Sequence, residues 1–135
     1  RTLDPAMQDK IHADIERTAE YIAASQGATV DVDIQRGYPV TFNDPALTEQ
    51  MAPTLERVGG DKTVRIDAIT GAEDFSFFQK KIPGLFIMVG GMPPDMDPSE
   101  AAPHHTPDFY IDESAMKTGV RALANLTIDY MLQAQ

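Results

Sequence analysis

The feature that most constrains the fold is the run Leu85-Phe86-Ile87-Met88-Val89, five apolar residues without a polar break. A short run of this kind is typical of a strand that is covered on both faces, as in a parallel α/β sheet. A second strand is expected near residues 63–69, followed by a short apolar helix after Phe75. This part of the sequence therefore predicts an α/β domain with a buried sheet and flanking helices.

The first forty residues have a different pattern. Asp4-Pro5 is a favourable helix start, because Asp accepts hydrogen bonds at an N-cap and Pro fits the first helical position. Apolar residues then recur at helical spacing until Gly27, which can end the helix. Residues 30–35 alternate between apolar and acidic or amide side chains, as in a strand with one dry face. The pattern predicts a small α+β layer.

Two further helices are expected beyond a break at residues 37–43. Asn43-Asp44-Pro45 opens the first, and Gly59-Gly60 ends it. The second runs from about residue 112 to residue 132. Its predicted inner face consists of Met116, Val120, Leu123, Thr127, Tyr130 and Met131.

Composition excludes several classes of protein. The chain has 135 residues, about one ordinary domain, and 42% of them are hydrophobic, so disorder is not expected. It has no cysteine, which removes disulfides, thiolate metal sites and cysteine nucleophiles. The formal net charge of −10 argues against binding to nucleic acid or to an acidic membrane, and no apolar run is long enough to cross one. These features predict a soluble protein; the compartment stays open between a bacterial-type cytoplasm and the periplasm.

The segment 90–109 lacks periodicity and contains five of the ten prolines. Long irregular loops in compact domains tend to be functional or disordered. Six acidic residues and no Lys or Arg lie between residues 92 and 115, which favours a cation in this region. His104-His105 lies inside it, and neighbouring residues of an extended chain point in opposite directions, so at most one is expected to bind a given metal. A loop histidine that hydrogen-bonds a carbonyl group is the alternative.

Other candidate sites are weaker. The run 95–100 fits a calcium loop poorly, because Pro98 and Glu100 occupy positions that need another ligand and a glycine. Glu73-Asp74 could be an acid–base pair, but adjacent carboxylates before a helix are more often caps. His12 is interpreted as a solvated side chain. Because zinc needs three or four protein ligands, the residues alone indicate an acidic α/β segment that contributes at most one histidine to an incomplete metal site.

Three sequence stretches match a known family in order and spacing. They are GAEDFSFF, PGLFIMVGG and HHTPDFYIDESAMKTGVRALANLTIDYM. Together they resemble the C-terminal third of the dinuclear metal amidohydrolases of peptidase family M-twenty, within the aminoacylase, hippurate hydrolase and auxin-conjugate hydrolase subfamily. Upstream, RTLDP, the helix after it and RGYPVTFNDP resemble the lid domain of that family and its return into the catalytic domain.

The resemblance implies a division of the chain. Residues 1–41 would be the second half of a ferredoxin-like α+β lid, through which such enzymes commonly form homodimers. Residues 42–135 would be the C-terminal part of a zinc-exopeptidase-like α/β domain, with a mixed, largely parallel buried sheet and flanking helices. An N-terminal part of the same protein would carry the other metal ligands and the general base.

The resemblance also implies roles for individual residues. His105 matches the last metal ligand of the family, whereas His104 has no implied role. Arg1 matches a lid arginine that grips the substrate carboxylate, as suits a guanidinium fork. The remaining implied substrate-binding residues are those of a turn close to the substrate, Gly71, Ala72, Glu73 and Asp74, and, as a candidate for structural or substrate contact, Asn43. The turn has Ala72 where the family has a second glycine.

The implied activity is hydrolysis of N-acyl amino acids or small peptide-like amides to a carboxylic acid and an amino acid. Two divalent metal ions per full-length subunit are expected, zinc first, with manganese, cobalt or nickel as alternatives. This chain would supply one ligand and no catalytic residue, so the chain alone is expected to be inactive. The alternative is a non-catalytic dimerisation or ligand-binding module derived from the same family.

Overall fold

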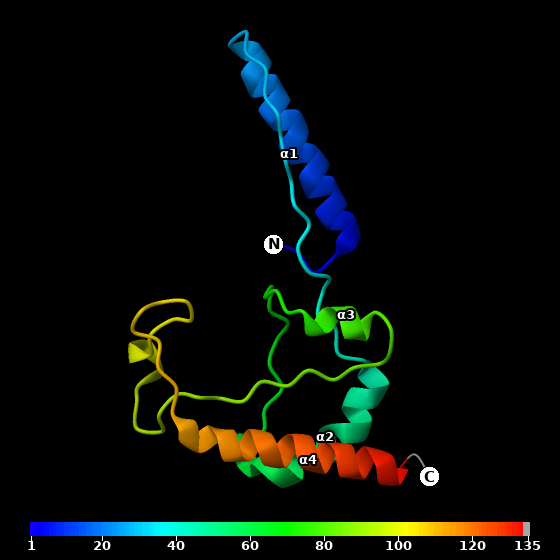
Figure 1. Ribbon diagram of the computed structural model, residues 1–135, viewed down its shortest axis with the longest axis vertical. Coiled ribbons are helices and arrows are strands. Elements are labelled where there is room, and N and C mark those ends of the chain that lie inside the picture. The colour runs from blue at the N-terminus through cyan, green and yellow to red at the C-terminus, as the bar shows by residue number, and fades with distance from the viewer. Residues whose placement is uncertain (134–135) are drawn as a thin grey trace. The chain divides into compact units, whose positions relative to one another are not determined.

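The computed structural model describes residues 1–133. They group into two compact units, Arg1–Phe42 with Asp67–Gly84, and Asn43–Ile66 with the chain from Leu85 onward. The first break lies one residue from the lid boundary expected from the resemblance, but residues 67–84 group with the first unit, which was not expected. The helices in Figure 1 are α1 (Pro5–Ser25), α2 (Pro45–Gly59), α3 (Phe75–Gln79) and α4 (Met116–Gln133).

Local capping explains why α1 and α2 begin where the sequence predicts. The carboxylate of Asp4 accepts a hydrogen bond from the backbone N–H of Ala6 at 2.9 Å, and Asp44 accepts one from Leu47 at 2.8 Å. In both helices proline follows the capping residue. Gly60 follows α2 with a φ of 57°, a left-handed conformation that glycine adopts without strain.

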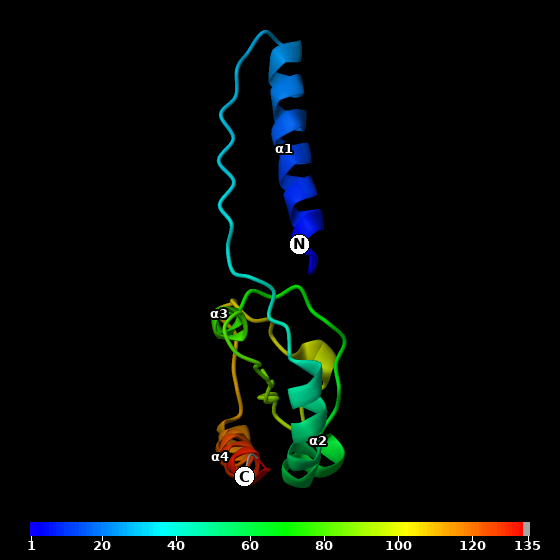
Figure 2. The same ribbon diagram turned by 90° about the vertical axis from the view of Figure 1, so that its right-hand side faces the viewer.

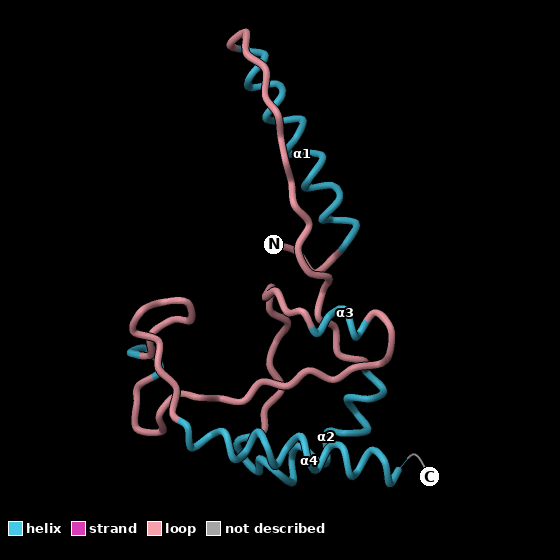
Figure 3. Tube along the Cα trace, in the orientation of Figure 1, coloured by secondary structure: helices cyan, strands magenta, loops and turns pink. Residues whose placement is uncertain are grey.

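The three predicted strands are not formed within residues 1–133. The segments 30–35, 63–69 and 85–89 appear as irregular chain in Figure 3. A strand requires a neighbouring strand to exchange backbone hydrogen bonds, and a sequence pattern specifies only which face of the segment is apolar. The expectation of a buried sheet is therefore not supported by the described residues.

The segment 28–36 of the first unit nevertheless runs back alongside α1 (Figure 2). Val32 and Ile34 are half-buried and the residues between and beside them are exposed, as the predicted alternation requires, but Val30 of the same predicted face is exposed. An ion pair between Arg36 and Asp9 joins this segment to α1. No side chain of α1 is fully buried, so this layer has little core.

In the second unit, Asn43 ties the start of α2 to the apolar run. Its side-chain Nδ2 donates to the carbonyl of Phe86 at 2.8 Å, and its Oδ1 accepts from the N–H of Phe86 at 2.7 Å. One side-chain amide thus makes the pair of hydrogen bonds that a neighbouring backbone would make in a sheet.

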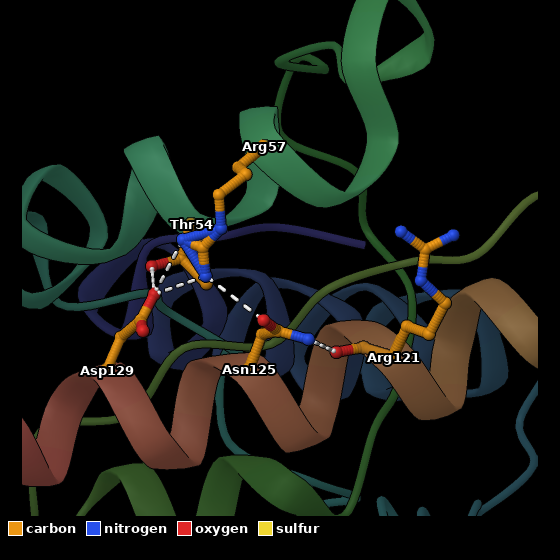
Figure 4. A network of polar contacts seen from close by, with 5 residues as sticks. All are labelled: Thr54, Arg57, Arg121, Asn125 and Asp129. Carbon is orange, nitrogen blue, oxygen red and sulfur yellow. Dashed lines mark hydrogen bonds and ion pairs between the residues drawn. The ribbon is translucent and has the colours of Figure 1, made fainter.

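The core of the second unit lies between α2 and α4. Met51 is 2% exposed, Thr54 3% and Ala122 5%. Beside them the Oγ1 of Thr54 donates to the carboxylate of Asp129 at 2.5 Å, and Arg57 donates to the same carboxylate at 2.7 Å. Figure 4 shows these contacts and a further hydrogen bond from Arg57 to Asn125. The pairing of the helices is therefore specified by a few apolar contacts and a polar cluster.

The predicted inner face of α4 is wrong. The face that meets α2 carries Ala122 and Asp129, because a small side chain permits close approach and the carboxylate finds partners there. Gly119, which was expected to mark close packing, lies near the side chain of Val89. The six predicted inner residues are instead exposed: Met116, Val120, Leu123, Thr127, Tyr130 and Met131. The described residues form no sheet that could cover this stripe.

The short helix α3 belongs to the first unit. Its Ser76 is fully buried, and the Ser76 hydroxyl has no hydrogen-bond partner among the described residues. The Oε1 of Gln79 accepts from the N–H of Phe42 at 2.9 Å, and its Nε2 donates to the carbonyl of Gly84 at 3.3 Å. Gln79 thus holds together the two chain segments that make up this unit.

Within residues 1–133, no helix combines the length and the apolar character needed to span a bilayer.

Candidate functional site

A cavity of about 650 Å³ lies within the first unit. This volume is within the range of roughly 300–1,000 Å³ that is usual for small-molecule sites. Its wall combines residues 1–5 and Gln8, residues 35–40, and residues 70–72 with Lys80. Three of the predicted substrate-binding residues, Arg1, Gly71 and Ala72, line this one cavity.

The guanidinium group of Arg1 is positioned by the backbone of the predicted substrate turn. Its Nη1 donates to the carbonyl of Thr70 at 3.0 Å, directly before Gly71. A guanidinium group has five N–H donors in a planar fork, so other donors stay available to a ligand. Because Gly71 has no side chain, the backbone of the turn can face the cavity directly.

The two acids of the turn have different surroundings. The Oε1 of Glu73 accepts from the N–H of Phe75 at 3.2 Å, which is a capping contact at the start of α3. Asp74 stands at the N-cap position, but its side chain makes no capping hydrogen bond. Neither carboxylate lines the cavity. The geometry of Glu73 thus fits the interpretation of a cap, and a substrate role for either acid stays a prediction.

Asn43 lies in the second unit, where both ends of its amide are engaged by the backbone of Phe86. This contact is structural, one of the two kinds of contact that the sequence prediction left open for Asn43. A substrate contact by Asn43 stays untested.

His105 lies on the long loop of the second unit and is exposed. Its φ of 66° is the only positive value at a non-glycine residue among those described. The premise that His104-His105 is extended therefore fails, because a left-handed residue turns the chain. The ring centroids of the two histidines are 6.4 Å apart. Strained backbone of this kind is concentrated at functional sites, where the surroundings hold it in place.

The chain around His105 is folded by local contacts. The Oγ1 of Thr106 donates to the carbonyl of Pro103 at 2.7 Å, and the N–H of Phe109 donates to the carbonyl of Thr106 at 3.1 Å. The ring of His104 lies 4.7 Å from that of Phe109. A packing partner for His104 agrees with the absence of any role for it in the resemblance.

Two of the acids in this loop are local caps. Hydrogen bonds from the backbone and the side chain of Ser114 hold the pKa of Asp112 below its ordinary value. The hydroxyl and the N–H of Ser99 lower the pKa of Asp97 in the same way. The Asp97 carboxylate caps a short turn, so the geometry does not favour the calcium reading of residues 95–100.

A metal site needs several ligands in one place. Within residues 1–133 no three His, Asp or Glu side chains lie close enough to hold an ion. The donors among these described residues therefore do not make up a metal centre by themselves. The role of His105 as a metal ligand stays a prediction.

Comparison with known proteins adds to this geometry. A family model described as peptidase family M20/M25/M40 matches residues 3–129. This chain belongs to that peptidase family. The match covers both units, including the cavity residues from Leu3 onward and the His105 loop.

Several curated relatives within this peptidase family carry the names of hydrolases. YhaA of Bacillus subtilis, named as an amidohydrolase, is 30% identical over 96% of this chain and 33% of its own length. Thermostable carboxypeptidase 2 of Saccharolobus solfataricus is 30% identical over 96% of this chain and 32% of its own. N-acetylcysteine deacetylase of Bacillus subtilis is 28% identical over 95% of this chain and 32% of its own length. No solved structure matches. The chain spans about one third of these relatives, and their hydrolytic names place it in a hydrolase family.

Sequence reasoning missed two basic residues of the cavity, Arg36 and Lys80. A signal was present, because Lys80-Lys81 is the only adjacent pair of Lys or Arg residues in this acidic chain. Arg36 directly precedes Gly37-Tyr38-Pro39, where the pattern breaks. The net charge of −10 is a sum over the whole chain and does not show such a local group of positive charges.

Proposed function

We propose that the protein to which this chain belongs hydrolyses the amide bond of N-acyl amino acids or small peptide-like substrates. The products are a carboxylic acid and an amino acid. The observation that carries this proposal is the cavity of the first unit. Arg1 and the turn 70–72 both line it, and the chain belongs to a family of hydrolases. The names of an amidohydrolase and a deacetylase among the relatives support amides as the substrate class.

In this proposal Arg1 binds the carboxylate of the substrate. Its hydrogen bond to the Thr70 carbonyl orients the guanidinium plane, so that two parallel N–H groups can meet two carboxylate oxygens. The backbone at Gly71 and the methyl group of Ala72 then form the wall beside the substrate amide.

His105 contributes one imidazole nitrogen to a centre whose other ligands come from outside this chain. Two divalent ions, zinc first and manganese, cobalt or nickel as alternatives, would supply a polarised carbonyl and an activated water. The described residues hold no complete ligand set, so no step of the reaction is assigned to a residue of this chain. A glutamate outside this chain is the proposed general base.

Residues 1–41 are proposed to be part of a lid that closes over the substrate and forms a homodimer. The apolar faces of segments 30–35, 63–69 and 85–89, and the exposed stripe of α4, support a sheet completed by another part of the protein. An apolar stripe of this extent is typical of a surface that is covered in the assembled molecule.

The test uses the full-length protein with N-acetyl and hippuryl amino acids, and release of the amino acid is measured by chromatography. Activity should disappear after dialysis against a chelator and return with Zn²⁺ or Mn²⁺. A full-length protein that binds these compounds but releases no product with any divalent ion would contradict the proposal and favour the non-catalytic module.

A further inference from the structure

The charge of the cavity is opposite to that of the chain. The sequence has a formal net charge of −10, yet the charged residues lining the cavity are Arg1, Arg36, Lys80 and one acid, Asp4. A concave site with an excess of one sign concentrates ligands of the other sign. The cavity is therefore suited to an anionic ligand.

The four charged groups are not equally free. Arg36 forms an ion pair with Asp9, which lies outside the cavity wall, so its charge is largely compensated. The Asp4 carboxylate accepts from the N–H of Ala6, at the positive end of α1. Within residues 1–133 no ion pair involves Arg1 or Lys80. Two cations without an ion-pair partner among the described residues thus remain, Arg1 and Lys80, beside one acid in the wall, Asp4.

These two cations come from separate segments. Arg1 precedes α1 and is held by the carbonyl of Thr70, whereas Lys80 directly follows the last residue of α3. The neighbouring Lys81 does not line the cavity. Because the two cations come from separate segments, each can bind a carboxylate of its own.

We infer that the cavity selects substrates with two acidic groups, with Arg1 binding one carboxylate and Lys80 the other. This inference rests on the proposed amide hydrolysis and narrows its substrate class. The second carboxylate can belong to an acidic amino acid, such as glutamate, or to a dicarboxylic acyl group, such as succinyl. In either case the Lys80 ammonium group is the specificity-determining contact.

The test measures kcat/KM of the full-length protein on two matched pairs of substrates. N-acetylglutamate is compared with N-acetylglutamine. N-succinylalanine is compared with the analogue in which the free succinyl carboxylate is an amide. Within each pair the two compounds differ only in whether the second carboxylate is present. A preference of about tenfold or more for the acid is expected in at least one pair, as a hydrogen bond between charged groups provides.

Three variants locate the effect. Lys80→Met should remove the preference by raising KM for the acid, and Lys80→Arg should restore most of it. Lys81→Met removes the same charge one residue away and should leave the preference unchanged. Equal kcat/KM within both pairs, or an equal loss in Lys80→Met for acid and amide, would overturn the inference.

A binding experiment separates this inference from the proposed reaction. Calorimetric titration with glutarate and with butyrate requires no turnover. Glutarate should bind at least about tenfold more tightly, and Lys80→Met should abolish the difference. Hydrolysis without any glutarate preference would refute the second-carboxylate contact alone, whereas a glutarate preference without hydrolysis would refute the proposed function alone.

Discussion

The two units use a buried hydroxyl group in opposite ways. In the second unit the Thr54 hydroxyl donates to Asp129, and the pair fixes how α2 meets α4. In the first unit the Ser76 hydroxyl is fully buried and has no partner among the described residues. The first unit also holds the cavity, which Arg1, Arg36, Lys80 and Asp4 help to line. The buried hydroxyl of the second unit thus stabilises packing, whereas that of the first unit makes no hydrogen bond among the described residues.

The largest expected effect comes from the loop of the second unit. In the full-length enzyme His105→Ala should lower kcat by several orders of magnitude, because a site that loses a ligand no longer positions its metal. Elemental analysis should show the loss of up to one ion per subunit, with little change in the melting temperature.

His104→Ala is the matched control, since it removes an adjacent imidazole that packs on Phe109. Its activity and metal content should stay near those of the parent. If His104→Ala has the larger effect, or if both variants keep full metal content and turnover, His105 is not a ligand.

The next effect concerns stability. Asp129→Ala should lower the free energy of unfolding by about 1–3 kcal/mol, because it leaves the buried Thr54 hydroxyl and the Arg57 guanidinium without their acceptor. Chemical denaturation of the full-length protein measures the change. The control is Glu49→Ala, which breaks an exposed ion pair with Arg65 and should cost less than about 1 kcal/mol. Similar losses in both would mean that the cluster is no stronger than a surface pair.

In the first unit, substitution of Arg1 should affect substrate binding and not the free energy of unfolding. Arg1→Lys should raise KM for N-acyl amino acids by about tenfold, since the bidentate fork is lost. The matching N-acyl amino acid amides lack that carboxylate and should respond far less. An equal rise for both substrate types would assign Arg1 another role.

Removing each buried hydroxyl should change the free energy of unfolding by a smaller amount, and the two changes test the comparison between the units directly. Ser76→Ala should not lower the free energy of unfolding and should raise it by up to about 1 kcal/mol, because no hydrogen bond is lost and an unpaired buried hydroxyl is removed. Thr54→Val should cost about 1 kcal/mol or more. A costly Ser76→Ala would reveal a partner for this hydroxyl in the complete protein.

The smallest effect is a pH dependence in α1. Hydrogen bonds from Lys10, and then from Arg17, lower the pKa of Asp14. Its contribution to stability is present above the unfolded-state pKa, about 3.9, and is lost as the pH falls through the lower folded-state value. An NMR titration of the Asp14 carboxyl should show a midpoint below 3.8, moving toward it in about 1 M salt. A midpoint at or above 3.8 in low salt would show that the two contacts do not persist in solution.

The sequence predicts the helices well because their starts are local. Asp4 and Asp44 act within three residues of themselves, so spacing alone identifies both caps. The strands fail for the converse reason, since segment 85–89 needs a neighbour that no local pattern supplies. The inner face of α4 was misjudged because apolar spacing does not show that α2 contacts Ala122 and Asp129.

The residues of the candidate site were predictable only where the sequence matches motifs of the family. Arg1, Gly71 and Ala72 were named from matching motifs and line one cavity. Arg36 and Lys80 were missed, because their place in the wall depends on contacts between distant segments. His105 was named from its motif, but its left-handed backbone could not be read from a Pro-rich loop.

The pairing of α2 with α4 has a consequence for the order in which the chain folds. Thr54 and Asp129 are 75 residues apart. Closing a loop of that length costs about 4 kcal/mol of chain entropy before any contact between the helices offsets it. The two helices are therefore expected to form early as separate segments and to dock late. On the ribosome, α2 is synthesised before α4, so Met51 stays exposed until α4 is available. During that interval a chaperone can bind the exposed apolar surface of α2.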